Sequence, residues 1–428
     1  MLVKTFGCAL FGIDAITVTI EVNIDRGMPS YFTVGLPDSA VKESQQRIEA
    51  AICNLGYYYP HKRIVVNLAP ADIRKEGSSY DLPIAIGILA AVGQLNDNLL
   101  EQFIIMGELS LDGTVNPIKG SLSIALKAKQ EGFRGLILPK ANASEAAVVE
   151  GLEVYGVSTI NEVISILNGE HEIQPVQATR FDETPDNFYE FDFSDVKGQE
   201  NIKRALEIAA AGGHNVILIG PPGSGKTMLA KRMPTILPPL TMAEALETTK
   251  IHSVAGLMGH HTSLIHKRPF RSPHHTISDA GLVGGGTYPQ PGEISLAHNG
   301  VLFLDELPEF KHSVLEVMRQ PMEDRVVTIS RAKMTVDFPA NFMMVAAMNP
   351  CPCGYYNHPD KECTCKPGMV QQYLNRISGP LMDRIDLHVE VVPVAYKDLS
   401  SKSSGEPSAV VRERVTKARK SDAPLATH

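Results

Sequence analysis

The fold is decided by one stretch, Asn215-Val216-Ile217-Leu218-Ile219-Gly220-Pro221-Pro222-Gly223-Ser224-Gly225-Lys226-Thr227. Its short apolar run predicts a buried parallel strand, and the residues after Thr227 favour a helix. Between them lies Gly-x-x-x-x-Gly-Lys-Thr, the spacing of a phosphate-binding loop. Glycines let backbone N–H groups turn around a β-phosphate, Lys226 can reach the β- and γ-phosphates, and Thr227 can offer its hydroxyl to Mg²⁺. We therefore predict a site for ATP and Mg²⁺, lined by Gly220, Pro221, Pro222, Gly223, Ser224, Gly225, Lys226 and Thr227.

A second apolar run, residues 301–304, ends in two carboxylates, Asp305 and Glu306. A buried strand that delivers two carboxylates at its C-terminal end supplies the other half of a nucleotide site. We expect Asp305 to hold Mg²⁺ through water and Glu306 to polarise the attacking water. Alone, such an ending is equally typical of a solvated strand end. The phosphate loop is what favours the catalytic interpretation.

The composition is that of a soluble globular protein with two or three domains. The chain has 428 residues, too many for one ordinary core, and 43% of them are hydrophobic and 21% charged. The formal net charge is −8, so a nucleic-acid surface would have to be local. Residues 1–22 lack the pattern of a signal peptide, and the apolar residues 82–92 are too few to span a bilayer. We therefore expect a cytoplasmic protein with no membrane partner.

Residues 1–168 alternate strand and helix patterns and predict an α/β domain without a phosphate loop of its own. The expected strands are residues 16–24, 63–68, 103–108 and 135–139, and the expected helices are residues 39–54, 81–92 and 122–131. An acidic, aperiodic segment over residues 169–192 is typical of a linker. We expect the ATPase domain to follow over residues 193–393.

Two stretches of the first domain, residues 75–85 and 107–118, resemble the proteolytic domain of the Lon family. In that family the first stretch carries the nucleophilic serine, which falls on Ser79 here. The catalytic lysine of the family lies a few residues beyond the second stretch, where this chain has Leu122. Because a serine nucleophile needs a neighbouring base, we predict a scaffold or binding platform that keeps the fold without proteolysis.

A long insertion separates the two halves of the predicted nucleotide site. The insertion contains cations, aromatic residues and histidines between prolines and glycines, a composition that favours a loop that binds an anionic polymer. A solvated surface loop is the alternative. Further on, residues 326–330 and 334–338 alternate around a short basic connection and predict a β-hairpin. The predicted DNA contacts are Arg268, Arg271, His274 and His275 in the insertion, and Arg331 and Lys333 near the hairpin tip.

A third predicted strand, residues 342–348, is followed by a group of cysteines. The strand ends at Asn349, whose polar side chain is placed to touch the γ-phosphate or its attacking water. His358 lies between two cysteine pairs as a spare ligand. The pattern favours a tetrahedral structural Zn²⁺ site over free thiols or disulfides in a reducing compartment, although Cys-x-Cys is rarer than Cys-x-x-Cys. The predicted ligands are Cys351, Cys353, Cys363 and Cys365.

Together these residues closely resemble the YifB/ComM family of magnesium-chelatase-like AAA+ ATPases. The most specific segments are residues 67–72, 212–215, 268–275, 291–300 and 373–376. The resemblance implies a Lon-like domain followed by a P-loop AAA+ α/β domain with a parallel sheet, assembled as an ATP-hydrolysing homohexamer. One member, ComM, is a DNA branch-migration helicase in natural transformation, which implies single-stranded or branched DNA as the partner. A chelatase-type remodeller of a protein partner is the alternative.

The resemblance also implies roles for single residues. Gly198 and Gln199 lie in the segment that contacts adenine in AAA+ ATPases, although a helix N-cap there explains the same sequence. Asn349 becomes the first sensor. Arg384 lies in the segment that carries the arginine finger and would act in the neighbouring subunit's site. Arg376 is the alternative finger, and a surface ion pair is an alternative explanation for either.

Residues 394–428 depart from the family pattern. AAA+ ATPases normally continue into a helical lid, but here residues 408–420 resemble only its first helix and residues 421–428 have no helical period. A lone helix cannot bury its apolar stripe, so it should fray or dock loosely. We therefore expect a truncated or frame-disrupted member that assembles poorly; a natural short lid is the alternative.

Overall fold

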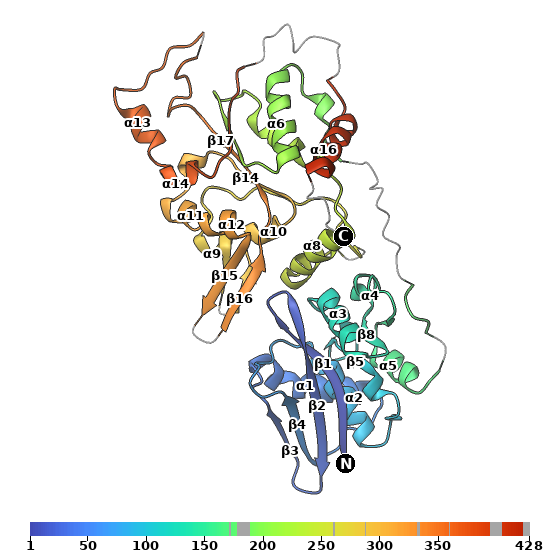
Figure 1. Cartoon of the computed structure of the whole chain (residues 1–428). Coiled ribbons are helices and arrows are strands. Elements are labelled where there is room, and N and C mark those ends of the chain that lie inside the picture. The colour runs from blue at the N-terminus through green and yellow to red at the C-terminus, as the bar shows by residue number, and fades with distance from the viewer. Residues whose placement is uncertain are drawn as a thin grey trace. The chain divides into compact units, whose positions relative to one another are not determined.

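The computed structural model describes residues 1–170, 173–177, 189–259, 262–286, 288–331, 334–358, 360–393 and 405–422. The chain divides into two compact units (Figure 1). The first comprises Met1–Phe181 and Thr249–Ile265, and the second comprises Asp182–Thr248 and His266–His428. The sequence-based boundaries had placed residues 249–265 with the ATPase domain, whereas the structure packs them in the first unit.

The first unit is built on a 7-stranded mixed sheet with the order β3-β4-β2-β1-β5-β8-β9. Antiparallel pairing joins β1 to β2 and β2 to β4, and the pairs β1–β5, β5–β8 and β8–β9 are parallel. The strands are β1 Leu2–Phe11, β2 Asp14–Asp25, β3 Ser30–Val34, β4 Arg63–Ala69, β5 Phe103–Ile105, β8 Gly135–Pro139 and β9 Glu153–Val157; β6 Glu108–Leu109 and β7 Val115–Asn116 form a separate small ribbon.

The helices of this unit are α1 Ser39–Asn54, α2 Asp81–Ala91, α3 Ser121–Glu131, α4 Lys140–Ala146 and α5 Ile160–Leu167. Every residue of α2 is buried, which explains why its sequence is apolar all round instead of amphipathic. It packs against β1 and β2. Three of the four predicted strands and all three predicted helices are confirmed for this region, and the strand predicted over residues 103–108 ends at Ile105. The sequence did not predict β1, β3, β7, β9, α4 and α5.

The second unit contains a 5-stranded sheet with the order β11-β14-β17-β10-β18, in which all pairs are parallel. Its strands are β11 Phe270–Arg271, β14 Val301–Leu304, β17 Met343–Met348, β10 Val216–Ile219 and β18 Leu387–Glu390. β14 and β17 are buried along their whole length, as expected for strands covered on both faces. Because parallel strands share one direction, the segments that follow β10, β14 and β17 meet at one edge of the sheet.

Helices and short ribbons surround this sheet. They are α6 Glu200–Gly212, α7 Lys226–Ile236, α9 Asp279–Val283, α10 Glu293–Leu296, α11 His312–Glu316, α12 Arg319–Asp324, α13 Met369–Leu374, α14 Gly379–Met382 and α16 Ser408–Asp422, with the ribbons β12 Gly284–Gly285 with β13 Gln290–Pro291 and β15 Val326–Arg331 with β16 Met334–Pro339. Helix α8 Met242–Ala255 begins in this unit, and its residues from Thr249 onward belong to the first unit. The predicted hairpin is confirmed, with Arg331 opposite Met334.

The expectation that the last helix frays or docks loosely is wrong. α16 packs against α6 and α7 in the second unit, and its Val411 and Val415 are 3% and 1% exposed. Ser408 accepts a hydrogen bond from the backbone N–H of Phe193 at 2.8 Å, and Arg414 pairs with Glu207 at 2.6 Å. The apolar stripe of α16 therefore finds its partners on the ATPase core.

No helix among the described residues is both long enough and apolar enough to cross a bilayer.

Candidate functional site

The phosphate loop lies between β10 and α7 and has the backbone that its glycines require. A side chain at Gly220 would come within 2.3 Å of the carbonyl oxygen of Val391, so only glycine fits there. Gly223 and Gly225 have φ angles of 76° and 91°, in the left-handed region that favours glycine. The loop therefore has the backbone path, and the following helix has the free N-terminus, that a phosphate group needs.

Polar side chains from three strand ends meet at this loop. Lys226 Nζ donates to the carbonyl oxygens of Gly220 and Pro221 at 2.7 and 2.9 Å and to Asn349 Oδ1 at 3.3 Å. Thr227 Oγ1 donates to Asp305 Oδ2 at 2.7 Å. The structure thus brings together the residues that the sequence had assigned to phosphate, to Mg²⁺ and to the γ-phosphate sensor.

The donor set fits a magnesium–triphosphate group. Thr227 and Asp305 place a hydroxyl and a carboxylate oxygen side by side, and oxygen is the ligand atom that Mg²⁺ prefers. Burial lowers the pKa of Lys226, and the nearby Asp305 carboxylate opposes this shift. Anionic phosphate oxygens would favour the charged amine further, which is the match that phosphate binding needs.

Glu306 follows Asp305 at a sharp turn and contacts a histidine. Its φ is 53°, and its backbone N–H donates to Asp305 Oδ1 at 2.9 Å. His275 Nδ1 lies 3.3 Å from Glu306 Oε2, and the His275 ring is 4.1 Å from that of His274. The sequence had assigned His275 to DNA; its position beside the predicted catalytic carboxylate could not be read from spacing alone.

Gln199 also reaches the phosphate loop. Its side-chain Nε2 donates to the carbonyl oxygens of Ser224 and Val392 at 3.0 and 3.1 Å. Gly198 and Gln199 have φ angles of 64° and 57° and lead into α6. The predicted adenine segment thus lies against the loop; the contact with adenine itself stays a prediction.

The prediction that Arg268 contacts DNA is wrong for this structure. Arg268 is only 8% exposed, and its guanidinium donates to Pro238 O at 2.6 Å and to Asn299 O at 2.7 Å. It also pairs with Glu244 at 3.2 Å. The guanidinium N–H groups that would bind a DNA phosphate are therefore bonded inside the domain. They connect the insertion to the segment before β14.

Arg271 likewise pairs with a carboxylate of its own chain. It forms a bidentate ion pair with Glu293 of α10, with two nitrogen–oxygen distances of 2.6 Å. The sequence segments 268–275 and 291–300 therefore bind each other, which accounts for their charges without DNA. Glu293 neutralises much of the charge that Arg271 would offer to a phosphate, and a DNA contact by Arg271 stays an untested prediction.

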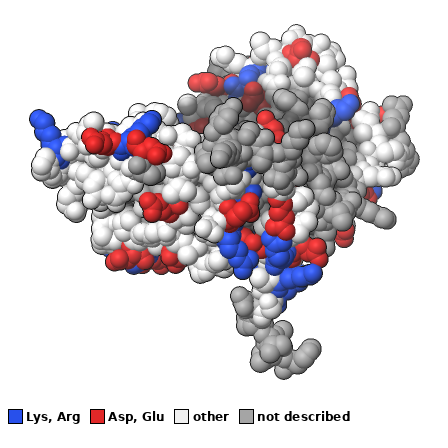
Figure 2. Space-filling view, turned by 90° about the horizontal axis from the view of Figure 1, so that it is seen from above, with Lys and Arg blue, Asp and Glu red and all other residues white. Residues whose placement is uncertain are grey.

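Two of the predicted DNA residues remain exposed. His274 lies at the surface with Nδ1 2.9 Å from Thr276 Oγ1, and Arg331 lies near the hairpin tip, where its Nε donates to Gly286 O at 3.3 Å. Lys333 lies outside the described residues. On the face seen in Figure 2, the described Lys and Arg side chains lie among Asp and Glu side chains, so positive charge is not gathered into one field there.

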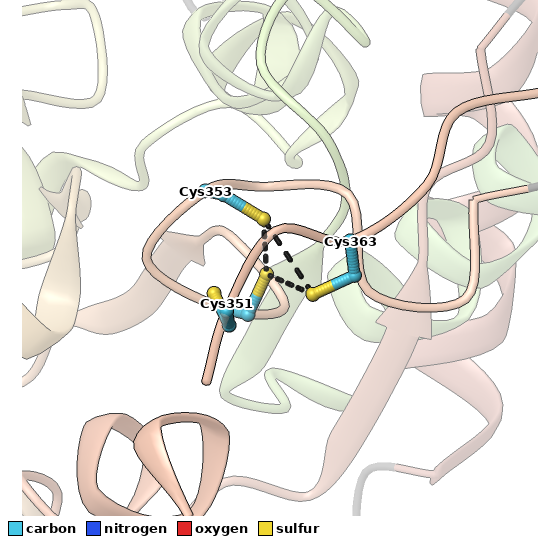
Figure 3. Close-up of side chains that lie close together, drawn as sticks. Cys351, Cys353 and Cys363 are labelled. Atoms are coloured by element: carbon cyan, nitrogen blue, oxygen red, sulfur yellow. Dashed lines mark hydrogen bonds between the residues drawn. The ribbon is translucent and has the colours of Figure 1, made fainter. Parts of the chain in front are cut away.

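The four cysteines predicted as metal ligands converge after β17. Their sulfur atoms all lie within 4.8 Å of one another, and Cys351 is buried. In Figure 3 the thiols of Cys351, Cys353 and Cys363 point toward one another, with sulfur–sulfur distances of 3.3, 3.6 and 3.8 Å. Hydrogen bonds from the backbone of Tyr355, from Cys351 and from the backbone of Thr364 lower the pKa of the Cys353 thiol. The cluster could hold a metal ion.

The cysteine loop also adjoins the nucleotide site. Asn349 lies two residues before Cys351 and accepts from Lys226, and a side chain at Gly354 would come within 2.4 Å of Pro222 Cδ. His358, the predicted spare ligand, turns its Nδ1 to the backbone N–H groups of Asp360 and Lys361 at 3.0 and 3.2 Å. It therefore belongs to the loop and not to the sulfur cluster.

Comparison with known proteins now decides the family. Residues 192–399 match the family model described as magnesium chelatase, subunit ChlI, and residues 20–142 match a second model for subunit ChlI of Mg-chelatase. Competence protein ComM of Haemophilus influenzae is 47% identical over 416 residues, which cover 96% of this chain and 81% of the relative. The protein YifB of Escherichia coli is 46% identical over 413 residues, covering 96% and 80%.

The chain belongs to the YifB/ComM family of magnesium-chelatase-like proteins. This membership implies an AAA+ ATPase. The chain is also similar to Lon protease 2 of Bacillus subtilis, with 33% identity over 154 residues that cover 33% of this chain and 26% of the relative. The expected fold, a Lon-like domain followed by a magnesium-chelatase-type AAA+ domain, is confirmed.

Within the Lon-like domain of this YifB/ComM protein, Leu122, which the sequence resemblance placed where Lon proteases have their catalytic lysine, is fully buried on α3. Its backbone N–H donates to Glu145 Oε1 at 2.9 Å, so this turn is a packed part of the core. Leucine cannot act as a base for Ser79. The predicted absence of proteolysis stays a prediction.

Both arginine-finger candidates are paired within the chain. Arg384 Nε donates to Glu323 Oε1 of α12 at 2.6 Å. Arg376 donates to Glu309 Oε1 at 2.8 Å and to Pro308 O at 3.4 Å, in the turn that directly follows Glu306. Arg376 thus contacts the turn after Glu306 in its own chain, and the assignment of the finger to Arg384 or Arg376 stays a prediction.

Proposed function

We propose that this YifB/ComM protein is an ATP-driven ring motor, a homohexamer that moves or displaces DNA strands as a branch-migration helicase in DNA uptake and recombination. The observation that carries the ATPase part is the pair of hydrogen bonds Lys226–Asn349 and Thr227–Asp305. They bring the phosphate loop, the carboxylate strand and the sensor strand to one point.

The chain's own residues would share the work of hydrolysis. Lys226 and the loop N–H groups would hold the β- and γ-phosphates, and Thr227 and Asp305 would hold Mg²⁺, which would neutralise charge on the phosphates. Glu306 accepts a proton from the attacking water, and Asn349 orients that water. Arg384 of a neighbouring subunit would stabilise the developing charge, contributing on the order of 10³-fold in rate.

The DNA part of the proposal is supported by the competence protein among the relatives and by the hairpin. Arg331 and His274 are the exposed candidates for contact with the phosphate backbone, together with Lys333. Such contacts are independent of sequence, which suits a motor. A remodeller of a protein partner remains the second candidate, because the matched family models describe a magnesium chelatase subunit.

We also propose a structural Zn²⁺ on Cys351, Cys353, Cys363 and Cys365. The convergence of the four sulfur atoms supports this, since thiolates are the usual ligands of a closed tetrahedral zinc site. The metal would hold Asn349 and the loop that packs on Pro222 in place without joining the chemistry.

The decisive experiment combines Glu306→Gln with a DNA titration. We expect the variant to bind ATP like the parent but to lose turnover, because an amide cannot accept the proton. Parent ATPase should rise with single-stranded or branched DNA and should lose this stimulation as salt increases. Turnover by Glu306→Gln at the parent rate would refute the assignment of Glu306. Absent DNA stimulation, with full ATPase activity, would favour the protein remodeller.

A further inference from the structure

A second polar cavity lies in the ATPase unit, away from the nucleotide site. It has a volume of about 380 Å³ and is lined by the segments that precede three strands: Gly213 before β10, Gly300 before β14 and Phe342 before β17. The phosphate loop and Asp305 follow the opposite ends of these strands. Since the strands are parallel, the cavity and the nucleotide site occupy opposite edges of the sheet.

The cavity gathers positive charge. Three guanidinium groups line it, those of Arg268, Arg325 and Arg419. Among its described lining residues the single carboxylate is Glu244, and Arg268 already pairs with it at 3.2 Å. The described lining therefore carries more positive than negative charge.

The other two arginines keep donors free for a ligand. Arg419 donates from Nε and Nη2 to the carbonyl oxygen of Ala210, at 2.9 and 2.7 Å, and among the described residues Nη1 has no hydrogen-bond partner. Burial lowers the pKa of Arg419, repulsion from Arg268 adds to this effect, and attraction to Glu244 opposes it in part. In the described part of the chain no carboxylate forms an ion pair with Arg419 or Arg325. A bound anion would relieve this repulsion.

Arg325 is held at the cavity by its backbone. Its φ is 59°, a conformation that non-glycine residues rarely adopt, and it ends α12. Its carbonyl oxygen accepts from Ala340 N–H at 2.8 Å, and its Nη1 donates to Asn341 Oδ1. These bonds keep the exposed guanidinium beside Asn341, another lining residue.

We propose that this cavity binds a phosphate group through Arg325 and Arg419. A guanidinium fork matches the oxygens of phosphate, and two uncompensated positive charges match a phosphate dianion or two adjacent backbone phosphates. The group belongs either to a free polyphosphate or to the phosphodiester backbone of a nucleic acid. The site is independent of the proposed ATPase chemistry, because it shares no residue with it.

The test titrates the full chain, with its phosphate loop filled by saturating MgADP, with inorganic pyrophosphate and separately with a short single-stranded oligonucleotide. Isothermal calorimetry should detect binding that Arg325→Gln and Arg419→Gln each weaken about tenfold, the effect of losing a charge-assisted contact. The control Lys417→Gln removes an equal charge from α16, where Lys417 is exposed and pairs with Glu413. It should leave binding unchanged.

Weakened pyrophosphate binding would identify a free polyphosphate as the ligand. Weakened oligonucleotide binding with no pyrophosphate binding would identify the nucleic-acid backbone. If the parent binds neither probe, or if Arg325→Gln binds like Lys417→Gln, the proposal is wrong. Arg419→Gln also removes the contact with Ala210 and could therefore disturb α16. Arg325 is exposed, so Arg325→Gln should fold and keeps the test decisive.

Discussion

Arg268→Met separates the structural role of Arg268 from a role in DNA binding. In the structure Arg268 is 8% exposed, pairs with Glu244 and donates to the backbone oxygens of Pro238 and Asn299. Methionine fills much of the same volume but offers no donor. The substitution therefore leaves a carboxylate and two carbonyl groups without their partner.

The expected loss of stability follows from these contacts. Removing one partner of a buried ion pair costs about 3 to 5 kcal/mol, because the remaining charge stays poorly solvated. The side chain of Glu244 is 30% exposed, so water compensates in part and the lower end applies. We expect the free energy of unfolding of the ATPase unit to fall by about 3 kcal/mol.

The assay pairs urea unfolding, followed by circular dichroism, with a salt titration of single-stranded DNA binding. Arg331→Met is the matched control, because Arg331 is exposed near the hairpin tip. It should change stability by less than about 0.5 kcal/mol and reduce the slope of log affinity against log salt by about 0.7. If Arg268→Met instead kept its stability and lost that slope, Arg268 would be a DNA contact and the structural interpretation would be refuted.

Two further predictions concern the cysteine loop and α16. Elemental analysis of protein purified without a metal-binding tag should find about one zinc per chain, and less than a tenth of that with four titratable thiols would reject the zinc site. Val415→Ala should lower the free energy of unfolding by about 2 kcal/mol, because Val415 is 1% exposed between α16 and the core. Val410→Ala, at a position that is 44% exposed on the same helix, should have almost no effect, and equal effects of the two would mean that α16 docks loosely.

The nucleotide site could be predicted from the sequence because each of its parts is local. A phosphate loop is one continuous segment between a strand and a helix, and its glycines indicate where the backbone adopts positive φ angles. Asp305 and Asn349 end two apolar strands, and parallel packing brings such ends together. The four cysteines lie within one loop, so their convergence could be predicted without knowing how distant parts of the chain pack.

The partners of charged side chains could not be predicted, because they come from distant parts of the chain. Arg271 finds Glu293, and Arg268 finds Glu244 on a helix that precedes it. A basic, histidine-rich segment looks the same in sequence whether its charges face a polymer or a carboxylate. The docking of α16 was missed for the same reason, since its partners α6 and α7 lie some two hundred residues earlier.

These internal pairs change where a DNA-binding surface could arise. With Arg268 and Arg271 neutralised within the domain, Arg331 and Lys333 are the predicted contacts that carry a full positive charge, and the net charge of the chain is −8. One such hairpin would hold DNA weakly, because each phosphate contact contributes little at physiological salt. In a cyclic assembly every subunit would present the same hairpin around one axis, so the basic surface would be a property of the ring. The proposed DNA binding should therefore depend on assembly, and a single chain should show little of it.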